Sequence, residues 1–381
     1  MSTAHGSTRI LHTSGYRDSQ GSGEPLNALG DWGWQAHFET AFAAVAAPDC
    51  VPARVIEVQR ERIHVVTADG EHAAQVAGRM RQDDAGWWPT VGDWVAARVS
   101  ADATIVHHVL ERKTTLSRKL AGKATREQVL AANVDTVFMV TSCNDDFSPR
   151  RIERYLTMIW ESGAQPVVLL NKSDLSADPH ALATEAEAVA LGVPVHAVSA
   201  HGDGGLVSLE PYLDPGKTIA LLGSSGVGKS TIVNRLLGAQ VQDVREVRGG
   251  DAKGRHTTTS RHLFRLPGGA LVVDTPGLRE LGLWFTESGL AEVFTDIEQL
   301  ATTCRFQDCA HANEPDCAVS AAVDDGRLAS ERLESYHRLR RELDYLERRA
   351  DPEAAANTKR RWRTIHKGMR AARKKGWMRD S

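Results

Sequence analysis

The sequence predicts a multidomain α/β protein: an OB-like antiparallel β-barrel, then a mostly parallel sheet with helices on both faces, then a helical domain. Three observations lead to this fold class. The chain has 381 residues, more than one hydrophobic core usually supports. Short β-prone runs alternate with turn signals over 51–112, whereas strand-like and amphipathic helical segments alternate over 134–274. Beyond residue 285 that pattern stops, and the sequence becomes helical and strongly charged.

We expect five segments along the chain. Their bounds are 1–34 for a flexible leader, 35–114 for the barrel, 115–285 for the α/β domain, 286–350 for a helical domain with a Cys/His cluster, and 351–381 for a basic C-terminal helix or tail. The leader is rich in Gly, Ser and Thr and lacks the continuous apolar core of a signal peptide. No run approaches the ~18 apolar residues that a membrane helix needs. We therefore expect a cytoplasmic protein without membrane contact.

The first folded segment, the barrel, contains short strand-like runs at regular spacing, which is typical of small antiparallel barrels. No catalytic constellation occurs among these runs, so a packed β module is the safer interpretation. Small barrels of the OB type often bind nucleic acid, but that link is an analogy of fold.

The central segment contains near-continuous apolar runs, as expected of strands buried on both faces of a parallel sheet. In chain order these runs are VDTVFMVTS, PVVLLN, VPVHAVSA, KTIALLG and ALVVD. Amphipathic stretches such as RRIERYLTMIWESG lie between them. The alternation predicts a doubly wound α/β domain.

A phosphate-binding loop follows the run KTIALLG. The pattern G-x-x-x-x-G-K-[ST] is satisfied by Gly223, Ser224, Ser225, Gly226, Val227, Gly228, Lys229 and Ser230, and Thr231 opens the helical sequence beyond it. The glycines let backbone N–H groups turn toward phosphate, and the helix N-terminus adds its positive dipole end. We expect Lys229 to reach the β- and γ-phosphates and the Ser230 hydroxyl to ligate Mg²⁺.

A second motif, DTPG, serves the metal and the γ-phosphate. Asp274 ends a buried strand and is suited to hold a Mg²⁺-bound water. Gly277 has no side chain, so its backbone N–H can approach the γ-phosphate. An isolated DTPG is compatible with an ordinary turn, but its pairing with a P-loop is specific.

The base-reading motif NKSD consists of Asn171, Lys172, Ser173 and Asp174. The Asp174 carboxylate can accept hydrogen bonds from N1–H and the N2 amine of guanine, whereas adenine has neither donor. The Lys172 stem can lie over the base. One helix and one strand later, Ser199 and Ala200 can offer a backbone N–H to guanine O6. The sequence therefore predicts GTP and GDP, rather than adenine nucleotides, as ligands.

The order of these motifs is unusual. The translation-factor-related GTPases carry them as P-loop, switch I, DxxG, NKxD and SA, whereas here NKSD and SA come first, so the domain is circularly permuted. With a barrel before it, a Cys/His cluster after it and GDAKGRHTTT between P-loop and DTPG, the chain resembles the RsgA family of ribosome-small-subunit-dependent GTPases. The resemblance covers roughly residues 35–381.

The segment GRHTTT occupies the place of switch I. We expect one of Thr257, Thr258 and Thr259 to reach Mg²⁺, and Thr258 is our choice. Leu278 follows DTPG, and its aliphatic side chain cannot orient a nucleophilic water. The family resemblance points instead to His256, for which a purely structural role is the alternative. Since no arginine finger is identifiable, we expect slow intrinsic hydrolysis and a partner that orders this segment.

The Cys/His cluster consists of Cys304, Cys309, His311 and Cys317. Three thiolates and one imidazole satisfy Zn²⁺ fully and leave no open position, so one structural zinc ion is expected. Disulfides are the competing interpretation, but a cytosolic chain disfavours them.

The basic tail is the last feature. Residues 355–381 contain ten Lys or Arg, among them Lys359, Arg360 and Arg361, and one acid, Asp380. Such a segment is suited to an anionic partner, because cations near a phosphate chain release condensed counterions. A solvated tail without a partner explains the same composition.

The resemblance implies a monomeric GTP hydrolase in late maturation of the small (30S) ribosomal subunit. It implies binding of the subunit and its rRNA in the GTP state and departure after hydrolysis, with contacts from the barrel, the cluster and the tail. Two alternatives stay open: a GTPase that acts on a non-ribosomal protein partner, and a nucleotide-gated RNA-binding protein in which hydrolysis is residual.

Overall fold

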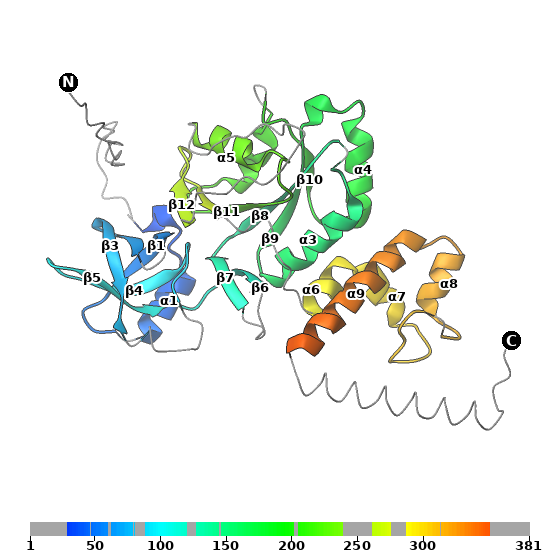
Figure 1. The fold of residues 1–381 in the computed structure, drawn as a ribbon, viewed down its shortest axis with the longest axis horizontal. Coiled ribbons are helices and arrows are strands. Elements are labelled where there is room, and N and C mark those ends of the chain that lie inside the picture. Colours follow the sequence, from blue (N-terminus) through cyan, green and yellow to red (C-terminus); the bar gives the residue numbers. More distant parts are fainter. Residues whose placement is uncertain are drawn as a thin grey trace, which may run out of the picture.

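A computed structural model shows a β-barrel, a sheet flanked by helices, and a helical C-terminal domain in a row (Figure 1). It describes residues 29–45, 47–59, 62–78, 80, 88–119, 127–144, 146–201, 205–238, 261–275, 287–312 and 314–350. This architecture confirms the predicted multidomain α/β fold class. Within the described residues, no helix is both long and apolar enough to cross a lipid bilayer.

The barrel is a closed ring of five strands. They are β1 (Val51–Gln59), β2 (Arg62–Thr67), β3 (Gly70–Val76), β4 (Trp94–Val99) and β5 (Thr104–Val109). The ring closes because β1 pairs with both β2 and β4, while β3 pairs with β5. Alternate side chains such as Val55, Val65 and Val106 fill the interior. Helix α1 (Ala36–Val45) covers the ring through Phe38, whose side chain packs against Trp94.

The central sheet contains five parallel strands in the order β10-β9-β8-β11-β13. These are β8 (Thr136–Ser142), β9 (Gln165–Asn171), β10 (Val195–Ala197), β11 (Thr218–Leu222) and β13 (Leu271–Asp274). Helices α3 (Pro149–Glu161) and α4 (Pro179–Val189) pack on one face, and α5 (Lys229–Leu237) with the 3₁₀ helix η3 (Val207–Tyr212) on the other. Strand β8 shows both faces directly. Val137 and Met139 belong to the hydrophobic core on the α3 side, and Phe138 and Val140 belong to the core on the α5 side. The predicted doubly wound arrangement is confirmed.

A shared strand joins the barrel to the central sheet, which the sequence did not anticipate. Strand β12 (Arg261–Arg265) pairs antiparallel with β13 on one edge and with β1 on the other, so that eleven strands form one continuous sheet. The Arg261 side chain reinforces the junction by donating to Thr90 Oγ1 at 3.2 Å and to the Val129 carbonyl at 3.0 Å. Val129 belongs to the hairpin formed by β6 (Thr115–Lys119) and β7 (Glu127–Ala132).

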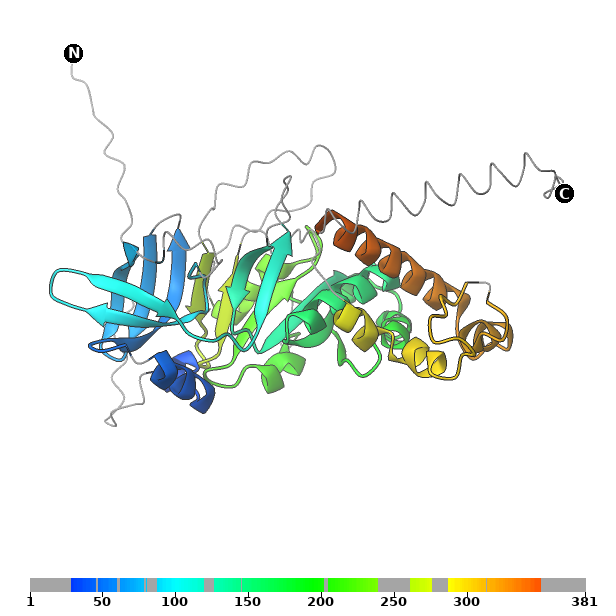
Figure 2. The same ribbon diagram turned by 90° about the horizontal axis from the view of Figure 1, so that it is seen from below.

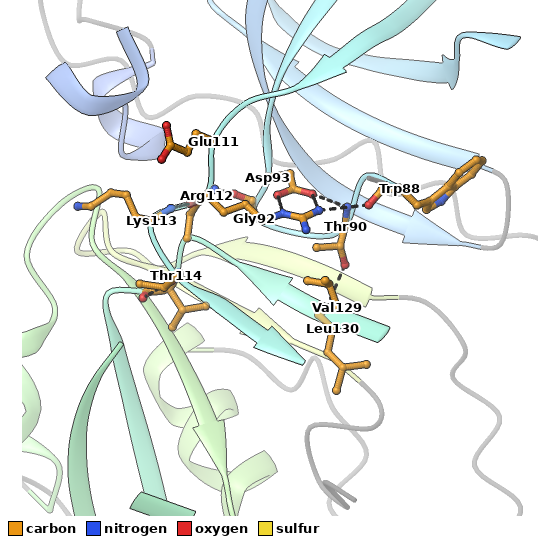
Figure 3. Close-up of polar contacts among 12 residues, drawn as sticks. Trp88, Thr90, Gly92, Asp93, Glu111, Arg112, Lys113, Thr114, Val129 and Leu130 are labelled. Carbon is orange, nitrogen blue, oxygen red and sulfur yellow. Dashed lines mark hydrogen bonds and ion pairs between the residues drawn. The ribbon is translucent and has the colours of Figure 1, made fainter. Parts of the chain in front are cut away.

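A buried ion pair shapes the loop that leads into β4 (Figure 3). Arg112 donates to both carboxylate oxygens of Asp93, at 2.7 and 2.8 Å, and to the Trp88 carbonyl at 3.2 Å. Asp93 in turn accepts the Thr90 N–H at 2.7 Å, and Thr90 donates to the Leu130 carbonyl. Burial raises the pKa of the Asp93 carboxyl, and the hydrogen bonds from Arg112 oppose that shift. The loop is thus held between the barrel and the hairpin.

Residues 29–34, which fall in the predicted leader, are packed against folded parts. Leu29 is buried beside Phe38, and Asp31 of the 3₁₀ helix η1 (Gly30–Trp32) pairs with Arg265 of β12 at 2.8 Å. The Trp32 carbonyl accepts a hydrogen bond from the buried guanidinium of Arg54. The predicted domain bounds otherwise stay predictions, and residues 1–28 and 351–381 lie outside the described part of the chain.

The C-terminal domain consists of helices that dock on α3, and its long helix α9 is best seen in Figure 2. The helices are α6 (Glu287–Val293), α7 (Thr295–Ala301), α8 (Ala318–Asp324) and α9 (Ser330–Ala350). Apolar side chains from these helices, such as Phe294 and Leu339, belong to the same core as Ile152 and Leu156 of α3. The C-terminal domain therefore shares one continuous hydrophobic core with α3.

A buried charge network anchors this interface. Arg332 of α9 donates to Glu153 of α3 at 2.6 Å and to Asp296 of α7 at 2.9 Å, and its guanidinium lies 4.4 Å from the Phe294 ring centroid. Ser335 donates to the other oxygen of Glu153. Glu153 is only 1% exposed, so its charge depends on these partners.

Replacing Arg332 by Ala should destabilise the docked domain strongly. The substitution leaves the buried Glu153 carboxylate without its cation, a loss of about 3–5 kcal/mol in comparable pairs. Urea unfolding followed by circular dichroism measures this change. The matched control is Arg327→Ala, which removes an exposed pair with Asp325 and should leave unfolding unchanged. Equal unfolding midpoints for the two variants would contradict the anchoring role.

Candidate functional site

The candidate site lies where the central parallel strands end. Because parallel strands point the same way, their carboxyl ends meet at one edge of the sheet, where ligands of open α/β sheets bind. Asn171 ends β9, the Ser199-Ala200 loop follows β10, the P-loop follows β11, and Asp274 ends β13. The structure thus brings together motifs that span about a hundred residues of sequence.

The P-loop backbone requires glycine at two close approaches. Gly228 has a φ of +99°, and a Cβ there would lie 2.2 Å from Asn171 Nδ2. Gly223 has a φ of +142°, and a Cβ there would lie 2.0 Å from the Val140 carbonyl oxygen. Any side chain at either position would force the loop away from its neighbours.

The P-loop itself holds the Lys229 side chain in place. Its side chain is buried, and Nζ donates to the carbonyl oxygens of Gly223, at 2.6 Å, and Ser224. Ser230 and Thr231 follow it in the first turn of α5. This arrangement fits the predicted phosphate cradle, because it fixes the ammonium beside the backbone N–H groups of the loop.

Asn171 connects the P-loop to the loop that contains Ser199 and Ala200. The amide Nδ2 donates to the Val227 carbonyl at 2.8 Å, and Oδ1 accepts the Ala200 N–H at 3.2 Å. Asn171 is 1% exposed, so both bonds are shielded from water. One buried amide therefore joins three of the predicted motifs.

The remaining NKSD residues bond to the P-loop and to the chain around Ser199. Lys172 adopts a left-handed conformation and donates from Nζ to the Gly226 carbonyl at 2.8 Å. Ser173 donates its backbone N–H to Val198, and Asp174 accepts a hydrogen bond from Ser199 Oγ at 2.6 Å. Asp174 lies in the 3₁₀ helix η2 (Ser173–Leu175) and is exposed, so its carboxylate is accessible to a base.

Several predicted site residues lie outside the described residues. They are Gly277, His256 and the three threonines Thr257, Thr258 and Thr259. Their roles at the γ-phosphate, the nucleophilic water and Mg²⁺ stay predictions. Of the residues predicted at the Mg²⁺ site, Ser230 and Asp274 are described, and both carry the oxygen atoms that Mg²⁺ and its bound waters prefer.

Sequence reasoning missed one side chain that contacts the P-loop. Arg151, in the first turn of α3, donates from Nη1 to Ser224 Oγ at 3.0 Å. Arg151 and Ser224 are separated by 73 positions, and neither motif spacing nor charge pattern links them. Only the packing of α3 against β8 and β9, with β11 next to β8 in the sheet, brings this contact about.

The Cys/His cluster is assembled in three dimensions. The ligand atoms of Cys304, Cys309, His311 and Cys317 all lie within 4.8 Å of one another. Cys317 Sγ lies 3.6 Å from His311 Nδ1 and 3.9 Å from Cys304 Sγ. The predicted group of three thiols and one imidazole is therefore confirmed as a group that could hold a metal ion.

Helix α8 helps one thiol of this group to ionise. Cys317 caps the helix, and its Sγ accepts the Ser320 N–H at 3.4 Å. Burial acts to raise the pKa of Cys317, but hydrogen bonds from Ser320 and His311 outweigh it and lower the pKa to about 6. Burial and the neighbouring thiols raise the pKa of Cys309 to about 11.

Comparison with known proteins identifies relatives across nearly the whole chain. The family model described as RsgA GTPase matches residues 109–284. A small ribosomal subunit biogenesis GTPase RsgA from Opitutus terrae is 47% identical over 356 residues, covering 90% of this chain and 97% of that protein. A protein of the same name from Syntrophotalea carbinolica is 45% identical, covering 90% of this chain and 98% of its own.

Solved structures show the same fold. The crystal structure of YjeQ from Thermotoga maritima has a TM-score of 0.59 and 27% identity, covering 77% of this chain and 98% of that one. YloQ, described as a circularly permuted GTPase, has a TM-score of 0.56 and 25% identity, covering 78% of this chain and 96% of its own. The permuted order inferred from the motifs thus has a structural counterpart.

Replacing Asp174 by Asn should weaken GTP binding by roughly 100-fold, because the new amide opposes guanine's N2 amine with a donor of its own. Xanthosine triphosphate, which carries a carbonyl at that position, should bind the variant better than the wild type. Calorimetry with both nucleotides measures this change. The control is Leu175→Ala at an exposed neighbour, which should bind GTP normally. Unchanged GTP affinity in Asp174→Asn would remove the base-reading role.

Purified protein should contain one equivalent of bound metal, and Cys309→Ser should lose it because one of four ligands is gone. Elemental analysis measures the metal, and hydrogen exchange should show faster opening of residues 290–350 with little change in nucleotide affinity. The control is Cys50→Ser, a cysteine outside the cluster. Metal-free wild-type protein would refute the assignment.

Proposed function

The chain belongs to the RsgA family of GTPases, and from this premise we propose that it hydrolyses GTP during maturation of the small ribosomal subunit. The chain is a GTPase, as its family and its relatives are. The observation that carries the proposal is the assembled site: Asn171 joins the P-loop to the guanine-reading loops, and Asp174 is accessible beside them.

The proposed reaction is attack of a water on the γ-phosphate of GTP, releasing GDP and phosphate. Lys229 neutralises charge that develops on the β- and γ-phosphate oxygens, and the P-loop N–H groups hold the phosphates in line. Ser230 and Thr258 are the proposed direct ligands of Mg²⁺, Asp274 is proposed to hold the ion through a bound water, and the ion supplies further charge neutralisation when it is bound. His256 orients the water, since Leu278 cannot.

The Cys/His cluster is proposed to hold one structural zinc ion. Zn–S bonds of about 2.3 Å at tetrahedral angles separate two thiolates by about 3.8 Å. The 3.9 Å between Cys304 and Cys317 fits that separation. Because all four positions come from the protein, the ion would stabilise the loops between α7 and α8 rather than take part in hydrolysis.

The proposed partners follow from the relatives and from charge. Relatives at 45–47% identity are named for biogenesis of the small ribosomal subunit. Ten basic residues in 355–381 suit contact with rRNA, and the barrel is proposed as a second contact. We propose that a monomer binds the subunit in the cytoplasm in its GTP state and leaves after hydrolysis. GTP and GDP are the nucleotide ligands of the two states.

Small ribosomal subunits should raise GTP turnover on the order of 100-fold, because the bound subunit would order the segment that contains His256. Turnover is measured with wild type and with His256→Ala, each with and without purified 30S particles. The variant should bind GTP and the subunit but lose most of the stimulation. Large subunits serve as the control. Equal wild-type rates with and without 30S particles would contradict the proposal.

A further inference from the structure

We propose that Arg151 is a positioning residue of the nucleotide site, which fixes the P-loop through Ser224 and thereby presents Lys229 to the phosphates. This inference rests on the proposed nucleotide site. It concerns a residue outside every motif of the sequence, and it gives α3 a role in nucleotide binding.

Arg151 has a defined set of contacts. Nη1 donates to Ser224 Oγ at 3.0 Å, to the Asp146 carbonyl at 3.1 Å and to the Asp146 carboxylate. Asp146 lies in the loop between β8 and α3, and its backbone N–H is held by Asn144. The guanidinium is therefore fixed between this loop and the P-loop.

Ser224 forms hydrogen bonds with both Arg151 and Lys229. Its hydroxyl accepts from Arg151, and its carbonyl oxygen accepts from Lys229 Nζ. A displacement of Ser224 consequently moves one of the two carbonyl groups that orient the Lys229 ammonium. Since a cradle works by holding donors in place before the ligand arrives, the bond to Arg151 contributes to preorganisation.

The effect of Arg151 is geometric rather than a direct attraction for phosphate. Its charge is balanced by Asp146, with which it forms a salt bridge. All of these bonds leave the single nitrogen Nη1, whose place is set by the length and planarity of the guanidinium, and the shorter lysine side chain would put its ammonium elsewhere. Charge alone is therefore not expected to replace it.

Helix α3 gives Arg151 a fixed base. Ile152 is buried in the core, and Glu153 is bound by Arg332 of the C-terminal domain. Arg154 pairs with Glu342 of α9 at 2.7 Å. The residues that follow Arg151 thus dock α3 on the C-terminal domain, while Arg151 itself contacts the P-loop.

The experiment compares Arg151→Ala, Ser224→Ala and the double variant. Each single change should weaken both GTP and GDP by roughly five- to tenfold, as expected for one hydrogen bond from a charged, partly exposed donor. The double variant should be no weaker than either single one, because both remove the same contact. Arg151→Lys should resemble Arg151→Ala. Calorimetry gives the affinities, and single-turnover hydrolysis at saturating GTP should fall in the same variants.

Arg150→Ala is the matched control, since Arg150 pairs with Glu334 on the surface and should leave both measurements unchanged. Thermal unfolding accompanies each variant, and Ser224→Ala tests the contact from its other side should Arg151→Ala fold poorly. Additive losses in the double variant, full rescue by Lys, or wild-type behaviour of Arg151→Ala would overturn the inference. Failure of the wild type to bind guanine nucleotides would instead overturn the proposed function.

Discussion

The buried amide of Asn171 is the interaction on which the site depends. It holds the Val227 carbonyl of the P-loop and the Ala200 N–H of the Ser199-Ala200 loop, and it lies against Gly228 so closely that only glycine fits there. Each of these loops follows a different strand. Asn171 bonds to both loops directly. An amide that serves both as donor and as acceptor sets them relative to each other, and the Lys172–Gly226 and Ser199–Asp174 bonds support the same arrangement.

Circular permutation leaves this constraint intact because it changes connections and not neighbours. The strand order β10-β9-β8-β11-β13 places the same ends at the same edge, whichever strand comes first in the chain. What the permutation changes is the continuation: the segment after Asp274 leads into α6, and Ser288 and Gly289 of α6 bind Glu161 of α3. The C-terminal domain is therefore attached to the same helix whose first turn reaches the P-loop.

The sequence predicted what is encoded locally. The P-loop, NKSD and the Cys/His cluster are each defined within a short stretch, and buried parallel strands are recognisable from their continuous apolar runs. It did not predict contacts that depend on tertiary packing, such as Arg151 with Ser224, Arg332 with Glu153, or β1 with β12. The packing of Leu29 was missed for the same reason, because a Gly/Ser-rich composition reports nothing about one anchoring apolar residue.

The barrel and the C-terminal domain are joined to the central domain by different kinds of interaction. The barrel is joined by backbone hydrogen bonds between β1 and β12. The other edge of β12 pairs with β13, the strand that ends at Asp274. A ladder of this kind fixes register, because slippage by one residue would turn every side chain to the other face. The C-terminal domain docks through side chains, and burial of Glu153 makes its attachment costly unless Arg332 is in place. Register is therefore built into the barrel junction, whereas the helical junction combines a shared apolar core with one buried carboxylate that must stay paired.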